Sequence, residues 1–287
     1  MRDFKYFRPK TLKEALKILR NERGKVLAGG TDLLVKMKDG LIYPESVIDI
    51  TLLEELRNIR QRDGRVEIGA LATLSMVASS QIIQLRAPHL AESARLIGSP
   101  QIRNMATIGG NIVNASPAGD SIPPLYTLNS ELILESENEK RVVKIEDFFS
   151  GPGVSSIRPH ELLTAITFPF PEEPFFSFFK KVGQRKALAI SKISLAFLGV
   201  IEEQGRSFRD VRISLGAVAP TVIRARRTED FLKGKIIDQK VLEEVSGLCA
   251  EETKPISDIR STSVYRRKVS GELLKKGLVE FTEGVIS

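Results

Sequence analysis

Hydrophobic positions in the first sixty residues switch between helix spacing and strand spacing. One helix is predicted behind the capping box of Thr11 and Glu14, because the following apolar residues share one helical face. These residues are Leu12, Ala15, Leu16 and Leu19. Short apolar strands are predicted at residues 26–28 and 46–50, with a second helix beginning near Thr31. The pattern indicates a small α/β unit.

The next hundred residues mix the two periodicities differently. Strand patterns fall at residues 65–71, 131–135, 141–145 and 162–168. Helical patterns fall at residues 73–83 and 88–97. This mixture predicts an α+β layer with a partly antiparallel sheet.

Three prolines among residues 169–174 predict a domain boundary. Strand-like stretches follow at residues 175–182, 190–201 and 211–218, and residues 224–284 are mostly helical. We therefore expect a small C-terminal sheet covered by helices. The predicted domains are residues 1–172, in two parts at about 1–58 and 59–172, and residues 173–287.

The cysteine and histidine counts limit the chemistry of the chain. One Cys cannot form an internal disulfide, and one Cys with two His cannot ligate an iron–sulfur cluster or a Cys/His zinc site. Cys249 follows Leu242 and Val245 at helical spacing, so we interpret it as a core residue. Neither His89 nor His160 suggests a functional role. Redox chemistry here would require an organic cofactor or a partner.

Charge and hydropathy place the chain among soluble proteins. The formal net charge is +7, and residues 175–220 hold eight basic and three acidic residues. A basic run with interleaved aromatic residues is missing, so this surplus favours an anionic ligand or an acidic partner over nucleic acid. The N-terminus has no signal-peptide pattern and no apolar run is long enough for a transmembrane segment. We expect a cytoplasmic protein.

Two glycine pairs are the main chemical candidates. Gly29-Gly30 precedes Thr31, and Gly109-Gly110 lies between Thr107 and Asn111. Glycine permits tight turns and close approach of a ligand, and exposed N–H groups at such turns bind anions. Two such loops suggest one pyrophosphate bound from both sides. Neither matches an established phosphate motif, so an ordinary strand-to-helix turn remains the alternative for each loop.

Four ordered motifs resemble those of the FAD-binding medium subunits of molybdenum hydroxylases. The motifs are Ala28-Gly-Gly-Thr-Asp32, Ile68-Gly-Ala-Leu71, Ile97-Gly-Ser-Pro-Gln-Ile-Arg103 and Thr107-Ile-Gly-Gly-Asn111. Two C-terminal segments, Ser214-Leu-Gly-Ala-Val-Ala-Pro220 and Ser263-Val-Tyr-Arg-Arg267, are similar to the C-terminal domain of that family. The resemblance extends over essentially the whole chain.

This resemblance implies an α+β fold with a two-part FAD-binding domain of the vanillyl-alcohol-oxidase (PCMH) type, followed by a small α/β C-terminal domain. It implies FAD contacts around the pyrophosphate, the ribose and the isoalloxazine ring. The implied contacts are Val26, Leu27, Ala28, Gly29, Gly30, Thr31, Asp32, Leu33, Leu34, Ile97, Thr107, Ile108, Gly109, Gly110, Asn111, Asp120, Leu163 and Lys181. Lys181 would lie near the ring, where a cation stabilises anionic reduced flavin. No residue of this chain is implied to act as a catalytic acid or base, or to bind a metal.

The resemblance also implies partners. A large subunit would carry the molybdenum cofactor and a small subunit two [2Fe–2S] clusters, in a heterotrimer that dimerises. Electrons would pass from the clusters through FAD to an acceptor such as NAD or a quinone. The chain lacks the cysteines of the subgroup whose medium subunit has its own iron–sulfur loop, which argues against that subgroup. The loop at residues 186–190 also lacks the acidic residues that are common at this place in the family.

Two alternatives to this interpretation differ in chemistry. A stand-alone flavin reductase, similar to the enzyme that reduces UDP-N-acetylenolpyruvylglucosamine, would share the FAD domain but need a general acid and a sugar-nucleotide site, neither of which we identify. A non-catalytic scaffold would have degenerate FAD loops, whereas both glycine pairs are intact here.

Overall fold

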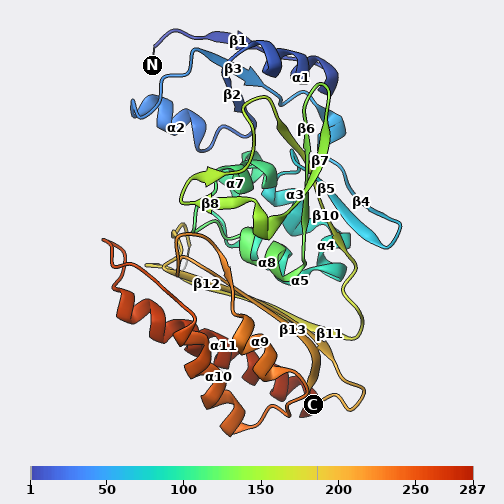
Figure 1. Cartoon of the computed structure of the whole chain (residues 1–287), viewed down its shortest axis with the longest axis vertical. Helices are drawn as coiled ribbons and strands as arrows, with labels where there is room; N and C mark the ends of the chain where they lie inside the picture. Colours follow the sequence, from blue (N-terminus) through green and yellow to red (C-terminus); the bar gives the residue numbers. More distant parts are fainter. Residues whose placement is uncertain (1, 186, 287) are drawn as a thin grey trace.

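The computed structural model describes residues 2–185 and 187–286, in which three main sheets follow one another along the chain (Figure 1). The first sheet is parallel, with strand order β1-β3-β2. Its strands are β1 (Lys5–Phe7), β2 (Gly24–Leu27) and β3 (Ser46–Asp49), and its helices are α1 (Leu12–Asn21) and α2 (Leu33–Lys38). Thr11 caps α1 by accepting a hydrogen bond from the Glu14 N–H. The α/β unit predicted from the sequence is confirmed.

The second sheet is antiparallel, with strand order β4-β5-β10-β6-β7. Its strands are β4 (Ile59–Arg62), β5 (Arg65–Gly69), β6 (Glu131–Glu135), β7 (Lys140–Lys144) and β10 (Leu162–Pro169). The predicted strands at residues 65–71, 131–135, 141–145 and 162–168 are confirmed to within about two residues. Strand β10, the longest of the five, lies in the middle, where almost all of its residues are buried, and the sequence shows it as an apolar run.

Helices fill the long connection between β5 and β6. They are α3 (Leu74–Ser79), α4 (Gln81–Arg86), α5 (Pro88–Arg95), α6 (Pro100–Met105), α7 (Ile108–Val113) and α8 (Ile122–Thr127). The single helix predicted at residues 73–83 is wrong. Ser80 is extended (φ −64°, ψ 122°) and caps α4 with its side chain, so the segment breaks into α3 and α4.

The third sheet has strand order β11-β12-β13-β14 and is antiparallel. Its strands are β11 (Phe175–Val182), β12 (Ile193–Ile201), β13 (Phe208–Gly216) and β14 (Ile223–Arg224), followed by α9 (Arg226–Leu232), α10 (Gln239–Glu251) and α11 (Ser263–Ile286). The predicted sheet covered by helices is confirmed. Cys249 is fully buried among the core residues of these helices, as the spacing predicts.

The third sheet lies between two helical layers (Figure 1). Alternate residues of β12 point to opposite faces. Ile193, Leu195 and Phe197 pack in the core with α10 and α11, whereas Leu198 and Val200 join the core of the second sheet. The sheet is therefore buried on both faces, with α5 and α8 on the face opposite α10 and α11.

Short elements complete the chain. They are the 3-10 helices η1 (Glu54–Leu56) and η2 (Ile145–Asp147) and the hairpin of β8 (Phe149–Gly151) and β9 (Val154–Ser155). Among residues 2–185 and 187–286, no helix combines the length and the apolar character needed to cross a bilayer.

Candidate functional site

The first glycine loop leaves β2 where the parallel strands end. Gly30 has a φ of +70°, a left-handed conformation that costs glycine little. In the part of the chain that the structure describes, no group accepts a hydrogen bond from the five backbone N–H groups of residues 29–33. Residues 29–31 are half-buried and Asp32 is exposed, so these donors remain open to a ligand. Successive free amides form a concavity that suits an anion.

Gly29 allows this loop to contact the segment that leads into the second loop. A Cβ on Gly29 would lie only 1.9 Å from the carbonyl oxygen of Met105, so no other residue fits without a shift. A second link comes from Lys36 of α2, whose Nζ donates to Asn114 Oδ1 at 3.0 Å. The same ammonium lies 2.7 Å from Asp32 Oδ2. The structure thus brings both predicted loops together.

The second loop uses its amides internally. The N–H groups of Ile108 and Gly109 donate to backbone carbonyls of residues 70–72 at 3.0 and 2.9 Å, and the Gly110 N–H donates to Thr107 Oγ1 at 3.1 Å. Thr107 is therefore the N-cap of α7. These three amides therefore have acceptors within the turn, and none of them is left for an anion.

Side-chain donors on α7 are still available near this turn. Asn111 Oδ1 accepts a hydrogen bond from Ser121 Oγ at 2.6 Å, which fixes the orientation of the amide. Nowhere in residues 2–185 or 187–286 does Asn111 Nδ2 meet an acceptor. The half-buried Asn111 can therefore donate to a ligand.

Asp120 and Lys181 form a buried ion pair between the helical layer and the third sheet. Lys181 Nζ, on β11, lies 2.6 Å from Asp120 Oδ2 and donates to the carbonyl oxygen of Leu96 at 3.2 Å. The second carboxylate oxygen, Oδ1, accepts a hydrogen bond from Ser191 Oγ at 2.5 Å. The side chains of Lys181 and Asp120 are only 9% and 5% exposed, so water screens the pair little.

Two effects oppose each other at the Asp120 carboxyl. Burial raises the pKa of Asp120 above its ordinary value, because a charge is costly in a poorly solvated site. The Lys181 ammonium and the Ser191 hydroxyl act in the opposite direction on this pKa, because both favour the ionised form. The charge of Asp120 therefore depends on both partners.

The two predicted apolar contacts lie in different surroundings. Ile97 is half-buried at the turn after α5, packs against the main core and accepts a hydrogen bond from Arg103 Nη1 at 3.1 Å. Leu163 is only 3% exposed and belongs to the same core on β10. Ile97 thus retains accessible surface for a ligand, whereas Leu163 already has protein neighbours on almost all sides.

The sequence did not point to Ser191 or to Met105. Ser191 stands in a segment of mixed polarity between two strands, and only the fold brings it to Asp120, 71 residues away. Met105 contributes its backbone carbonyl rather than its side chain, so the residue type gives no indication of this contact. The one available signal concerned Met105, which lies between the resemblance motifs at residues 97–103 and 107–111.

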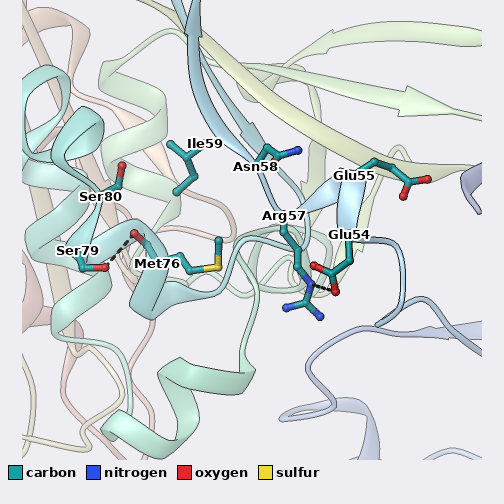
Figure 2. Close-up of a pocket in the computed structure, with 8 residues that line it drawn as sticks. All are labelled: Glu54, Glu55, Arg57, Asn58, Ile59, Met76, Ser79 and Ser80. Carbon is teal, nitrogen blue, oxygen red and sulfur yellow. Dashed lines mark hydrogen bonds and ion pairs between the residues drawn. The ribbon is translucent and has the colours of Figure 1, made fainter. Parts of the chain in front are cut away.

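A separate hollow lies between η1 and the helices α3 and α4 (Figure 2). It is lined by Glu54, Glu55, Arg57, Asn58, Ile59, Met76, Ser79 and Ser80. None of the predicted FAD contacts lines it, and Arg57 there is paired with Glu54 at 3.3 Å. Across the described ranges, no group of three or more His, Cys, Asp or Glu side chains is arranged to hold a metal ion.

Two family models match the chain along most of its length. Residues 2–171 match the FAD binding domain in molybdopterin dehydrogenase, and residues 177–281 match the CO dehydrogenase flavoprotein C-terminal domain.

Individual relatives agree with these models. The chain is 34% identical to the glyceraldehyde dehydrogenase medium chain of Sulfolobus acidocaldarius, over 97% of this chain and 98% of the relative. It is 31% identical to the carbon monoxide dehydrogenase medium chain of Hydrogenophaga pseudoflava, over 96% of each chain.

Solved structures give the same result for the fold. A cyanide-inactivated Cu,Mo-CO dehydrogenase superposes with a TM-score of 0.92 at 31% identity, covering 98% of each chain. Quinoline 2-oxidoreductase from Pseudomonas putida 86 superposes with a TM-score of 0.93 at 25% identity, covering 100% of this chain and 99% of that one. The fold class and the resemblance predicted from the sequence are confirmed, and the chain belongs to the family of FAD-binding medium subunits of molybdenum hydroxylases.

Proposed function

We propose that this subunit holds the pyrophosphate of FAD against the free amides of residues 29–33. The observation that carries the proposal is the run of five backbone N–H groups without an acceptor among the described residues, beside a left-handed glycine. Such a run stabilises a phosphate by direct hydrogen bonds. Asn111 would donate from the opposite side, since its Nδ2 is free in the same part of the chain.

The remaining predicted contacts would surround the rest of the cofactor. Residues 26–28 and 32–34 form the walls of the first loop, and Thr107 through Gly110 shape the turn that supports Asn111. Ile97 would offer its accessible apolar surface, and Leu163 would contact the cofactor only through the small part of its side chain that stays exposed. Asp120 would lie near the ribose or diphosphate region of FAD, and Lys181 would lie near the isoalloxazine ring.

The chain contributes binding and electrostatics rather than acid–base catalysis. When bound, FAD accepts electrons one at a time and passes on one or two, which links one-electron clusters to a two-electron acceptor. Lys181 holds a positive charge within a buried site, where its field is weakly screened. Two of its three N–H groups are taken by Asp120 and Leu96, which leaves one for a ligand.

We also propose the complete assembly and its location. A large molybdenum-cofactor subunit and a small subunit with [2Fe–2S] clusters would join this chain in a heterotrimer that dimerises, in the cytoplasm, with NAD or a quinone as acceptor. The names of relatives as medium chains support a multi-subunit enzyme, and the similar CO dehydrogenase is described as a Cu,Mo protein. A stand-alone flavin reductase or a scaffold is not favoured, because medium subunits match over nearly their full length.

We also propose the domain boundaries predicted above, residues 1–172 and 173–287, with parts at about 1–58 and 59–172. The support is that each main sheet stays within one of these ranges. The parallel sheet uses strands up to Asp49, the second sheet uses strands from Ile59 to Pro169, and the third begins at Phe175.

A pair of glycine variants tests the pyrophosphate site. Gly30 and Gly64 have nearly the same left-handed φ, +70° and +73°, but Gly64 lies in the β4–β5 turn, away from the loop. Alanine in either position costs about 1–2 kcal/mol of backbone strain. We expect Gly30→Ala to lose most of its bound FAD and Gly64→Ala to retain it, measured as flavin absorbance per chain after purification. Equal retention in both variants would contradict the assignment.

A further inference from the structure

Ser191 connects the loop between β11 and β12 to the helical layer. The side chain is buried, with 2% of the residue exposed, and it lies two residues before β12 begins. Its Oγ donates to Asp120 Oδ1 at 2.5 Å, while Lys181 Nζ occupies Oδ2 at 2.6 Å. The two carboxylate oxygens are thus held by two different donors, which leaves the Asp120 carboxylate little freedom to rotate.

This contact is not a general property of serines in the third sheet. Ser194 lies three residues further along, is fully buried, and its hydroxyl has no hydrogen-bond partner in the described structure. Burial alone therefore does not bring a hydroxyl here onto a carboxylate. Ser191 is distinguished by its position opposite the connection between α7 and α8, where Asp120 stands.

The hydroxyl of Ser191 is connected to Lys181 through the Asp120 carboxylate. Without it, Oδ1 would be a buried acceptor with no partner, which raises the free energy of the ionised carboxylate. A carboxylate that is less firmly held also fixes the ammonium less firmly, because Asp120 is the only acidic group that pairs with Lys181 among the described residues.

We propose that Ser191 is a positioning residue, which orients the Asp120 carboxylate and thereby holds Lys181 where its charge acts on the cofactor. The proposal rests on the proposed function, since it assumes that Lys181 faces bound FAD. Ser191 itself need not touch the flavin. Its effect is on the reduction potential and affinity of the cofactor rather than on the stability of the chain alone.

The test uses the FAD-loaded full chain and three variants. Ser191→Ala removes the hydroxyl, Ser191→Thr retains one, and Ser194→Ala removes a buried hydroxyl without a hydrogen-bond partner among the described residues. The measurements are the FAD dissociation constant, the flavin reduction potential against a reference dye, and the thermal unfolding temperature. We expect Ser191→Ala to weaken FAD binding about ten-fold, the equivalent of one charge-assisted hydrogen bond, and to lower the potential. Ser191→Thr should have the FAD affinity and the reduction potential of the unmodified chain. Ser194→Ala should also leave both quantities unchanged.

A double-mutant cycle separates positioning from packing. In an Asp120→Asn background, Ser191→Ala should cause no further change in potential, because the group through which it acts is already altered. If Ser191→Ala shifted only the unfolding temperature, or shifted the potential equally in both backgrounds, the proposal would be overturned. A chain that bound no FAD before any substitution would instead contradict the proposed function, so the two failures are distinguishable.

Discussion

At the scale of single residues, Asp120 and Lys181 act as one buried ion pair rather than as two independent contacts. The sequence predicts a separate cofactor contact for each, but the structure joins them at 2.6 Å. Removing one partner would leave the other as an uncompensated buried charge, which typically costs about 3–5 kcal/mol. Substitutions at either position therefore affect folding as well as the cofactor, which is why the neutral Ser191 is the more informative position to change.

His89 provides a pH-dependent prediction at the same scale. Its Nε2 lies 3.0 Å from Thr127 Oγ1, which itself donates to the Pro124 carbonyl, so Nε2 carries the proton and donates. Burial lowers the pKa of His89 from 6.5 to about 3. The unfolded chain therefore binds a proton between these values and the folded chain does not. Stability should fall by about 1.4 kcal/mol per pH unit as pH drops below 6.5.

The measurement is urea unfolding at a series of pH values between 4.5 and 7, in about half-unit steps. His89→Gln retains a donor for Thr127 but has no titrating group, so it serves as the control. We expect the stability of the unmodified chain to decline faster than that of the variant as the pH falls. Parallel curves would show that His89 is not responsible for the acid sensitivity.

At the scale of elements, glycine determines how closely the C-terminal helices pack. A Cβ on Gly271 of α11 would lie 2.1 Å from the carbonyl oxygen of Ser246 on α10. A Cβ on Gly277 would lie 2.0 Å from the ring of Phe178 on β11. These two glycines allow the backbone of α11 to lie against the backbone of α10 and against the Phe178 ring, which larger residues would prevent.

Two glycines in these helices should respond to alanine in opposite ways. Gly271→Ala is expected to lower stability by about 1–3 kcal/mol, because the added methyl group meets a backbone carbonyl. Gly247 of α10 is exposed, and a Cβ there would meet no atom of the described residues within 4 Å. Gly247→Ala should therefore raise stability by about 0.5–1 kcal/mol through helix propensity.

Chemical denaturation of both variants beside the unmodified chain checks this pair. A stabilising Gly271→Ala would mean that α10 and α11 separate easily at this crossing. Loss of stability in Gly247→Ala would mean that this face of α10 is not free in the folded chain.

At the scale of the whole molecule, Arg224 links the third sheet to the segments that flank β6 and β7 of the second. Its guanidinium is paired with Glu229 at 2.6 Å and reaches Glu146 at 3.2 Å and Asn129 Oδ1 at 3.1 Å. Glu229 also accepts the Ile213 N–H at 2.8 Å, so its carboxylate is fully engaged. The side chains of Arg224 and Glu229 are nearly inaccessible, whereas Glu146 is about one-third exposed.

These contacts predict unequal effects of removing two acidic partners of one arginine. Glu229→Ala leaves a buried guanidinium without its main partner and should lower stability by about 3–5 kcal/mol. Glu146→Ala affects a partly solvated pair and should cost no more than about 1 kcal/mol. Equilibrium unfolding in urea measures both. Similar losses in the two variants would show that burial does not govern the strength of this connection.

The order of elements could be predicted from the sequence because it depends on local spacing. Alternating apolar residues and the proline-rich stretch at residues 169–174 indicated the sheets and the start of the third one. The break at Ser80 was missed because it depends on the Ser80 side chain, which caps α4 in place of a continuous helix. The spacing of hydrophobic residues alone does not predict such a cap.

The sequence by itself determined which loops and which motifs matter, because glycine pairs and ordered motifs are properties of neighbouring residues. Only the tertiary structure decided how their atoms are used. Among the described residues, the amides of residues 29–33 have no acceptor, whereas those of Ile108 and Gly109 donate to carbonyls just after β5 and that of Gly110 donates to the Thr107 hydroxyl. Likewise, Ser191 and Asp120 become partners only when the third sheet packs on the helical layer, because contacts between distant segments depend on packing rather than on local pattern.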